Sequence, residues 1–293
     1  MKPPRFAYHD PDTRSEVLAL LDTYTDDAKV LAGGQSLVPL LNMRLAQPAH
    51  LLDINRLPDL TYIREEDGGL AIGALTRQRD IELSSLVRHR CPLLAEAIPF
   101  IGHAPIRSRG TVGGSLAHAD PAAELPAVLL ALGGHVRAES HLGSRQIRAE
   151  DLFVSQLQTS LTSTELLTEA WFPVAPPRSG AAFIEVSRRH GDFALVGVAV
   201  QLTLHENGAI AAAHLVFMGV AATPVRTLAA ESFLLDKQPD EEAFTAAAEL
   251  IVSDLDPDTD LHASAEYRRD VAVVLVNRAL QTAANRARQG GEL

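Results

Sequence analysis

Cysteine is almost absent from the chain, since Cys91 is the only thiol among 293 residues. A single thiol can neither form an internal disulfide nor supply the four thiolates that usually hold an iron–sulfur cluster. The 11 histidines are scattered, without a His-x-x-x-His or Cys-x-x-Cys spacing, so the sequence predicts no bound metal. Cys91 stands directly before Pro92 and two leucines, which is typical of a buried residue at a helix end rather than a nucleophile.

Positive charge and long apolar runs are also scarce. The 26 Lys and Arg residues stand against 37 Asp and Glu, which gives a formal net charge of −11 at pH 7. Without a basic stripe to neutralise phosphates, the chain is not expected to bind nucleic acid. No apolar run is long enough for a membrane span, and residues 1–11 lack the apolar core of a signal peptide. We therefore expect a cytoplasmic protein.

The most informative feature that is present is a pair of short glycine-rich segments. They are the first glycine loop, Ala32-Gly33-Gly34-Gln35-Ser36, and the second glycine loop, Thr111-Val112-Gly113-Gly114-Ser115. Because glycine has no Cβ, it can adopt positive φ and let a ligand approach the backbone, where successive N–H groups form an anion site. One such pair is usually a plain turn. Two pairs with the same Gly-Gly-polar pattern predict a site for a cofactor that contains a diphosphate.

A dinucleotide-binding crossover is the alternative for the first glycine loop. Asp53 follows Gly33 at about the spacing expected for a ribose-binding acid. However, the segment reads Gly-Gly-x-x rather than Gly-x-Gly-x-x-Gly, and residues 37–45 allow only a short helix before Pro48. We therefore interpret Asp53 as a structural acid at a strand end.

The chain divides into three expected units, at residues 1–55, 56–177 and 178–293. In the first, Thr13-x-x-Glu16 has the form of a capping box and predicts a helix to about residue 23, and apolar runs predict strands at 29–32 and 51–54. The second mixes short strands and helices. Its expected elements are a strand at 70–73 and helices at 80–87, at 92–101 and from Pro126 onward.

The proline-rich stretch 175–180 marks the boundary of the third unit. Apolar runs predict a three-stranded antiparallel sheet, and the Asn207-Gly208 pair predicts a hairpin between its last two strands. Helical patterns follow. The expected strands are 182–187, 194–204 and 210–219, and the expected helices are 228–235, 241–252 and 264–287.

The residues around both glycine loops resemble a known family. Segments 32–57 and 106–127 resemble the two signatures of the FAD-binding medium subunit of the molybdenum hydroxylases, the group that contains carbon monoxide dehydrogenase and xanthine dehydrogenase. Segments 188–194 and 262–269 are similar to two further motifs, and all four occur in the family's order. The resemblance spans nearly the whole chain.

The resemblance implies an α+β fold. It consists of an FAD-binding domain of two subdomains, similar to the vanillyl-alcohol-oxidase (PCMH-like) type, and a C-terminal α+β domain. It also implies a function. Electrons would come from a molybdenum centre on a large subunit, through iron–sulfur clusters on a small subunit, to FAD on this chain and then to an unidentified acceptor. No side chain is then required as a nucleophile or general base, because the cofactor carries the chemistry.

The resemblance also implies which residues contact FAD. The diphosphate contacts map onto Ala32, Gly33, Gly34, Gln35, Ser36 and Leu37 in the first loop, and onto Thr111, Gly113, Gly114 and Ser115 in the second. Ile101, Glu124 and Leu161 rest on resemblance alone, with Leu161 expected at the isoalloxazine ring. Phe193 matches an aromatic that covers one flavin face in some members. The alternative for Phe193 is a core phenylalanine at the start of a strand.

Two departures from the family pattern accompany these matches. Many members have a lysine where this chain has Ile184-Glu185, and His262 replaces an arginine. Two other functions stay open from the sequence. The chain could be a stand-alone FAD-dependent oxidoreductase, or a nucleotide-binding assembly module without redox activity.

Overall fold

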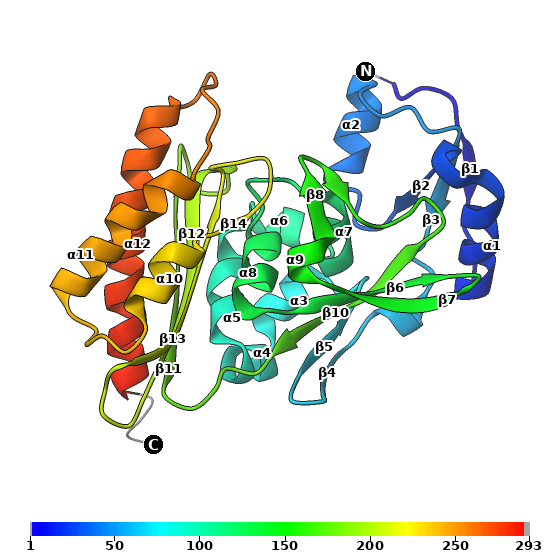
Figure 1. Ribbon diagram of the computed structural model, residues 1–293. Helices are drawn as coiled ribbons and strands as arrows, with labels where there is room; N and C mark the ends of the chain where they lie inside the picture. Colours follow the sequence, from blue (N-terminus) through cyan, green and yellow to red (C-terminus); the bar gives the residue numbers. More distant parts are fainter. Residues whose placement is uncertain (1, 290–293) are drawn as a thin grey trace.

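The computed structural model describes residues 2–289. Three groups of elements follow one another across the molecule in chain order, from the N-terminal group on one side to the group that contains α12 on the other (Figure 1). The first group is a small parallel sheet with the strand order β1 (Ala7–His9), β3 (His50–Asp53), β2 (Ala28–Leu31). Helix α1 (Arg14–Tyr24) begins where Thr13 accepts a hydrogen bond from the Glu16 N–H, as the capping-box pattern predicts.

The middle of the chain forms a five-stranded antiparallel sheet with β10 at its centre. The strand order is β4 (Ile63–Glu66), β5 (Gly69–Gly73), β10 (Leu166–Pro173), β6 (His135–Ser140), β7 (Gly143–Arg148). The inner strand β5 is buried along its whole length, and its Leu70 and Ile72 belong to the largest core of the protein. A short hairpin, β8 (Phe153–Ser155) and β9 (Gln158–Thr159), precedes β10.

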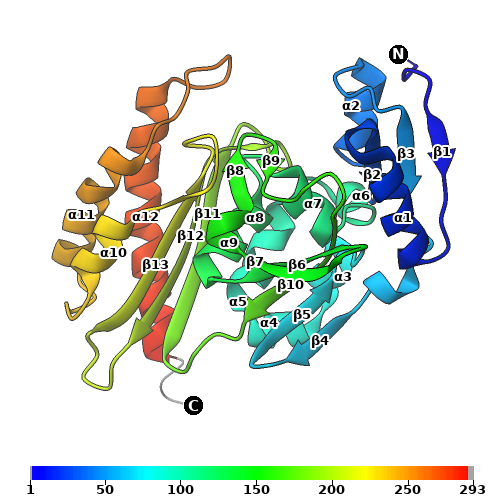
Figure 2. The same cartoon turned by 45° about the vertical axis from the view of Figure 1, so that its right-hand side comes forward.

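Short helices cover this sheet. They are α3 (Gln78–Leu83), α4 (Ser85–Arg90), α5 (Pro92–Ala97), α6 (Ala104–Arg107), α7 (Val112–His118), α8 (Glu124–Leu132) and α9 (Ala149–Leu152). Every residue of α8 is buried, because it packs against the middle sheet and against strands of the C-terminal sheet (Figure 2). A helix that is apolar on all sides has to be buried on all sides, and packing between two sheets achieves this. Cys91 lies buried between α4 and α5, which confirms its expected place at a helix end.

The C-terminal residues form an antiparallel sheet between two layers of helices. Its strands are β11 (Ser179–Ser187), β12 (Ala194–Leu204), β13 (Ile210–Met218) and β14 (Val225–Arg226). Helices α10 (Leu228–Leu234), α11 (Glu241–Leu250) and α12 (Ala265–Gln289) pack on one face, and α5 and α8 pack on the other. The sheet therefore links the C-terminal helices to the middle of the molecule.

Three details differ from the sequence prediction. Helix α8 begins at Glu124 rather than Pro126, because a proline in the first turn occupies a position whose N–H has no partner within the helix. The helix expected at 80–87 is two helices, since Ser84 ends α3 and its side chain caps α4. The three expected C-terminal strands are present, and the short β14 adds a fourth at the edge.

Candidate functional site

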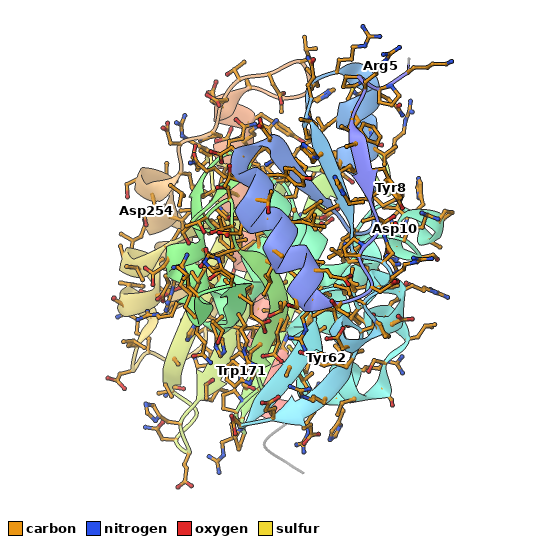
Figure 3. The ribbon with its side chains drawn as sticks, turned by 90° about the vertical axis from the view of Figure 1, so that its right-hand side faces the viewer. Arg5, Tyr8, Asp10, Tyr62, Trp171 and Asp254 are labelled. Atoms are coloured by element: carbon orange, nitrogen blue, oxygen red, sulfur yellow. The ribbon has the colours of Figure 1, made fainter. Side chains whose placement is uncertain are left out.

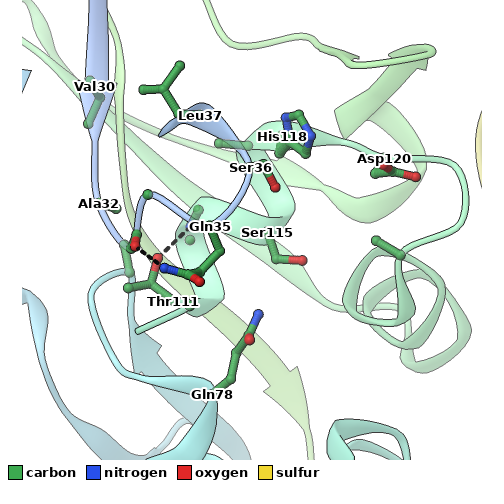
Figure 4. Close-up of a pocket in the computed structure, with 18 of the residues that line it drawn as sticks. Val30, Ala32, Gln35, Ser36, Leu37, Gln78, Thr111, Ser115, His118 and Asp120 are labelled. Atoms are coloured by element: carbon green, nitrogen blue, oxygen red, sulfur yellow. Dashed lines mark hydrogen bonds between the residues drawn. The ribbon is translucent and has the colours of Figure 1, made fainter. Parts of the chain in front are cut away.

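A cavity of about 550 Å³ lies where the N-terminal, middle and C-terminal groups of elements meet. Residues of both glycine loops, of the α8 start and of the β11–β12 loop line it. Every site residue expected from the sequence lies on its wall: Ala32, Gly33, Gly34, Gln35, Ser36, Leu37, Ile101, Thr111, Gly113, Gly114, Ser115, Glu124, Leu161 and Phe193. Figure 4 shows the part of the wall that the two glycine loops form.

The first glycine loop connects β2 to α2 (Leu37–Met43) and offers free backbone donors. Gly34 has φ +72°, in the left-handed region that favours glycine. Within residues 2–289, the consecutive N–H groups from Gly33 to Leu37 donate no hydrogen bond to the protein. The Gln35 side chain instead stabilises the turn by donating from Nε2 to the Gly33 carbonyl at 2.9 Å (Figure 4). Successive free N–H groups around a positive-φ residue can bind an anion.

The second glycine loop has a different structure, which corrects part of the sequence prediction. Its residues Val112 to Ser115 form the first turn of α7, and neither glycine has positive φ. Their N–H groups are already used within the protein. The Val112 N–H donates to the Thr76 carbonyl, and the Gly113 N–H donates to the Ala74 carbonyl. The Gly114 N–H donates to the Thr111 hydroxyl (Figure 4), and the Ser115 N–H donates to the Thr111 carbonyl.

Close packing explains why glycine is required at positions whose φ values are ordinary. A Cβ on Gly113 would lie 2.5 Å from the Ala74 Cβ, and a Cβ on Gly114 would lie 2.6 Å from the Thr111 hydroxyl. Gly33 faces the second loop in the same way, because its Cβ would lie 2.3 Å from the Arg109 carbonyl oxygen. These glycines therefore let the two loops and the end of β5 approach one another closely.

Side-chain donors complete the polar wall. Ser36 and Ser115 both line the cavity, and neither hydroxyl forms a hydrogen bond within residues 2–289. Sequence reasoning missed Gln78, the buried first residue of α3, whose Oε1 has no hydrogen-bond partner in the described chain. No motif surrounds Gln78, so only its position beside Gly110 in the fold reveals it. Figure 4 shows its side chain extending toward the cavity from below the loops.

The start of α8 adds an acidic and desolvated group to the cavity wall. Glu124 is only 7% exposed, and burial together with the nearby Glu185 and Asp120 raises the pKa of its carboxyl to about 8. Glu185, on β11, lies near Glu124 but does not line the cavity. Within the described residues its buried Oε2 has no hydrogen-bond partner, and burial raises its pKa to about 7. Among the lining residues of the described chain, Lys29 is the only lysine or arginine. An anion in this cavity would therefore be held mainly by neutral donors.

Phe193 lies on the loop between β11 and β12 and is 67% exposed, so it is not the core residue of the alternative interpretation. The same loop packs on the middle of the molecule, since a Cβ on Gly191 would lie 2.4 Å from the His103 ring. Ile101 and Leu161 are half-buried apolar residues of the wall. Together these residues give the cavity an apolar part beside its polar loops.

Comparison with known proteins agrees with this geometry. Residues 4–175 match the family model of the FAD binding domain in molybdopterin dehydrogenase, and residues 181–283 match that of the CO dehydrogenase flavoprotein C-terminal domain. The chain is 47% identical to the 6-hydroxypseudooxynicotine dehydrogenase complex subunit alpha of Paenarthrobacter nicotinovorans, covering 98% of this chain and 97% of that one. It is 39% identical to the carbon monoxide dehydrogenase medium chain of Hydrogenophaga pseudoflava, covering 97% and 98%.

Solved structures show the same similarity in three dimensions. A carbon monoxide dehydrogenase from Hydrogenophaga pseudoflava contains a chain with a TM-score of 0.95 at 40% identity, covering 98% of this chain and 99% of that chain. Quinoline 2-oxidoreductase from Pseudomonas putida 86 contains one with a TM-score of 0.92 at 35% identity, covering 98% and 99%.

Proposed function

The chain belongs to the FAD-binding medium subunits of the molybdenum hydroxylases, a family of oxidoreductase complexes, and from this premise we propose that it is an electron-transfer subunit. In this proposal it takes electrons from iron–sulfur clusters on a partner subunit and passes them to an external acceptor. FAD, when bound, supplies the redox chemistry. The residues of this chain bind the cofactor, orient it and limit its exposure to water.

The free N–H groups of the first glycine loop are the observation that carries the proposal. Five consecutive donors, from Gly33 to Leu37, face no protein acceptor within residues 2–289. The Ser36 and Ser115 hydroxyls add two side-chain donors on the same cavity. A diphosphate is the ligand group that such a set of neutral donors fits, so we assign its binding to the first loop and Ser115.

The apolar and acidic parts of the cavity suit the rest of the cofactor. We assign the flavin ring to the part lined by Ile101, Leu161 and Phe193. Exposed Phe193 would cover one face of the ring and limit the access of water. Burial raises the pKa of the Glu124 carboxyl to about 8, so the carboxyl is neutral below this pH. In its neutral form it can donate a hydrogen bond to a cofactor oxygen or nitrogen.

The partners follow from the family and from the residues of this chain. Buried Cys91 is the only thiol, so iron–sulfur clusters and a molybdenum centre must lie on other polypeptides. We propose a small iron–sulfur subunit and a large molybdenum subunit, working in the cytoplasm. We further propose domain boundaries at 1–55, 56–177 and 178–293, because each range contains one complete sheet of three or more strands.

Affinity purification of the tagged chain from its native host tests this function. We expect two further polypeptides, with iron, molybdenum and FAD, and reduction of the flavin when a substrate of the complex is added. Purification of a yellow chain alone, with steady turnover by itself, would instead indicate a stand-alone flavin oxidoreductase. A colourless chain that takes up no FAD would indicate a nucleotide-binding assembly module.

A further inference from the structure

A continuous set of hydrogen bonds supports the first glycine loop from behind. Tyr8 on β1, at the edge of the N-terminal sheet (Figure 3), donates to Asp53 Oδ2 at 2.8 Å. Asp53 Oδ1 accepts from the backbone N–H of Asn55 at 2.9 Å and from its Nδ2 at 2.6 Å. Asn55 Nδ2 also donates to the Ala32 carbonyl at 2.9 Å. This carbonyl immediately precedes Gly33, so the hydrogen bonds reach the start of the loop.

Arg77 connects these groups to the segment just before the second glycine loop. Its Nη2 donates to Asn55 Oδ1 at 2.8 Å, and its Nη1 donates to the Arg109 carbonyl at 2.7 Å. The Arg109 carbonyl is the group against which Gly33 packs. We call Tyr8, Asp53, Asn55 and Arg77 the loop clamp. It joins the N-terminal sheet to the segment that precedes α7, and it contacts both sides of the Gly33 packing site.

The chemistry of Arg77 indicates a positioning role. Within residues 2–289 it forms no ion pair with a carboxylate, and both of its hydrogen bonds go to neutral oxygens. Burial and the neighbouring Arg109 lower the pKa of its guanidinium. A planar guanidinium can reach two fixed acceptors at once, which a lysine ammonium on a flexible stem does far less well. The arginine here is used for its geometry.

We propose that Asn55 and Arg77 are positioning residues that hold the first glycine loop in its FAD-binding conformation before the cofactor arrives. Neither residue lines the cavity, so both act through the Ala32 and Arg109 carbonyls. This inference rests on the assignment of the cavity as the FAD site. Holding a loop in its bound conformation increases affinity because less ordering accompanies binding. Asn55 is exposed, so loss of its hydrogen bonds should affect the loop more than the stability of the whole chain.

The test compares Arg77→Lys and Asn55→Ala with Arg90→Lys in the full chain. Arg90 is a matched control, because it also donates two hydrogen bonds, to exposed Glu65, and does not line the cavity. FAD affinity is measured by flavin fluorescence after removal and re-addition of FAD, and Tm is measured on the FAD-free chain. We expect the two clamp variants to bind FAD about tenfold more weakly with nearly unchanged Tm. The control should match the wild type in both.

Hydrogen exchange and a double variant separate positioning from a general structural role. In the FAD-free chain, amides 32–37 should exchange faster in the clamp variants, while the amides of β5 keep their protection. The FAD affinity of the double variant should be about the same as that of the weaker-binding single variant. The two losses should not add, since both residues act through one chain of hydrogen bonds.

Unchanged FAD affinity in both clamp variants would overturn the inference, and so would an affinity loss that simply follows a loss of Tm. If the wild-type chain itself takes up no FAD, the proposed function fails, and the clamp has no cofactor loop to position.

Discussion

The two glycine loops have nearly the same sequence pattern and opposite roles for their backbones. In the first loop, Gly34 adopts positive φ and the N–H groups from Gly33 to Leu37 stay free within residues 2–289. In the second, Gly113 and Gly114 are helical, and the protein itself accepts their hydrogen bonds. A Gly-Gly pair therefore indicates that something approaches the backbone closely. Whether that is a ligand or the rest of the protein depends on long-range contacts.

The largest effect should come from Gly113→Val. Its Cβ would lie 2.5 Å from the Ala74 Cβ and 2.9 Å from the Ala74 carbonyl oxygen, at a buried site where α7 packs on the end of β5. We expect a loss of about 3 kcal/mol in the free energy of unfolding, measured by denaturant titration of the FAD-free chain. Gly114→Ala should cost less, since its closest neighbour is the Thr111 hydroxyl. A Gly113→Val chain of normal stability that fails to bind FAD would mean that the second loop is a ligand loop like the first.

Gly34→Ala should separate binding from stability. Alanine at φ +72° costs about 1 kcal/mol, and its Cβ would lie 3.2 Å from Val38 Cγ2, so the loop has to change shape. We expect FAD affinity, measured by fluorescence titration, to fall at least tenfold. Gly68→Ala is the matched control, because Gly68 has φ +76° with open space around it and does not line the cavity. Its stability loss should be similar and its FAD affinity normal; equal FAD affinity in the two variants would contradict a ligand role for Gly34.

The sequence predicts which residues form the cavity better than it predicts how each one acts. The glycine pairs, Phe193 and Glu124 are all on the cavity wall, because local patterns and a family resemblance preserve position. The occupied N–H groups of Val112 and Gly113 could not be predicted, since their acceptors on Thr76 and Ala74 follow the end of β5, far away in the chain. Gln78 was missed for the same reason. Its surroundings exist only after α3 packs beside Gly110.

The same limit applies to the fold. Alternating apolar runs predict the three long C-terminal strands, whose pattern is local. The two-residue strand β14 has too few residues to show a pattern, and only pairing with β13 defines it. The start of α8 at Glu124 is likewise fixed by burial from both sides rather than by a local signal, since Ala123 provides no side-chain cap.

The pH dependence of stability should distinguish the buried carboxyls near the start of α8 from the first loop. A carboxyl whose folded pKa is raised contributes stability below its ordinary pKa, and this contribution is lost as pH rises through the folded value. The ordinary pKa of both carboxyls is 4.5 and the folded values of Glu185 and Glu124 are about 7 and about 8, so the Tm of the FAD-free chain should fall between about pH 5 and pH 8 and then level off. Because Glu185 is half-buried, solvent screening limits its part to on the order of 1 kcal/mol.

Glu185→Gln checks this expectation by differential scanning calorimetry. The variant should lose less Tm than the wild type on going from pH 5 to pH 8, because the amide does not ionise. Glu65→Gln is the control, since the Arg90 side chain lowers the pKa of the Glu65 carboxyl and places its titration below this range. A wild-type Tm that stays level across the range would show that these carboxyls are hydrated in solution.

The smallest effects on stability should come from the two cavity hydroxyls, one on each loop. Ser36→Ala and Ser115→Ala each remove a donor that forms no hydrogen bond within residues 2–289, so the Tm of the FAD-free chain should not change. A hydrogen bond to a charged diphosphate oxygen contributes about 1.5 kcal/mol, and we expect each variant to bind FAD roughly tenfold more weakly in a fluorescence titration. Ser115 is the more informative of the two, because the N–H groups of the first turn of α7 are already occupied. If Ser115→Ala binds FAD normally while Ser36→Ala does not, the second loop serves the cofactor only as packing support for the first.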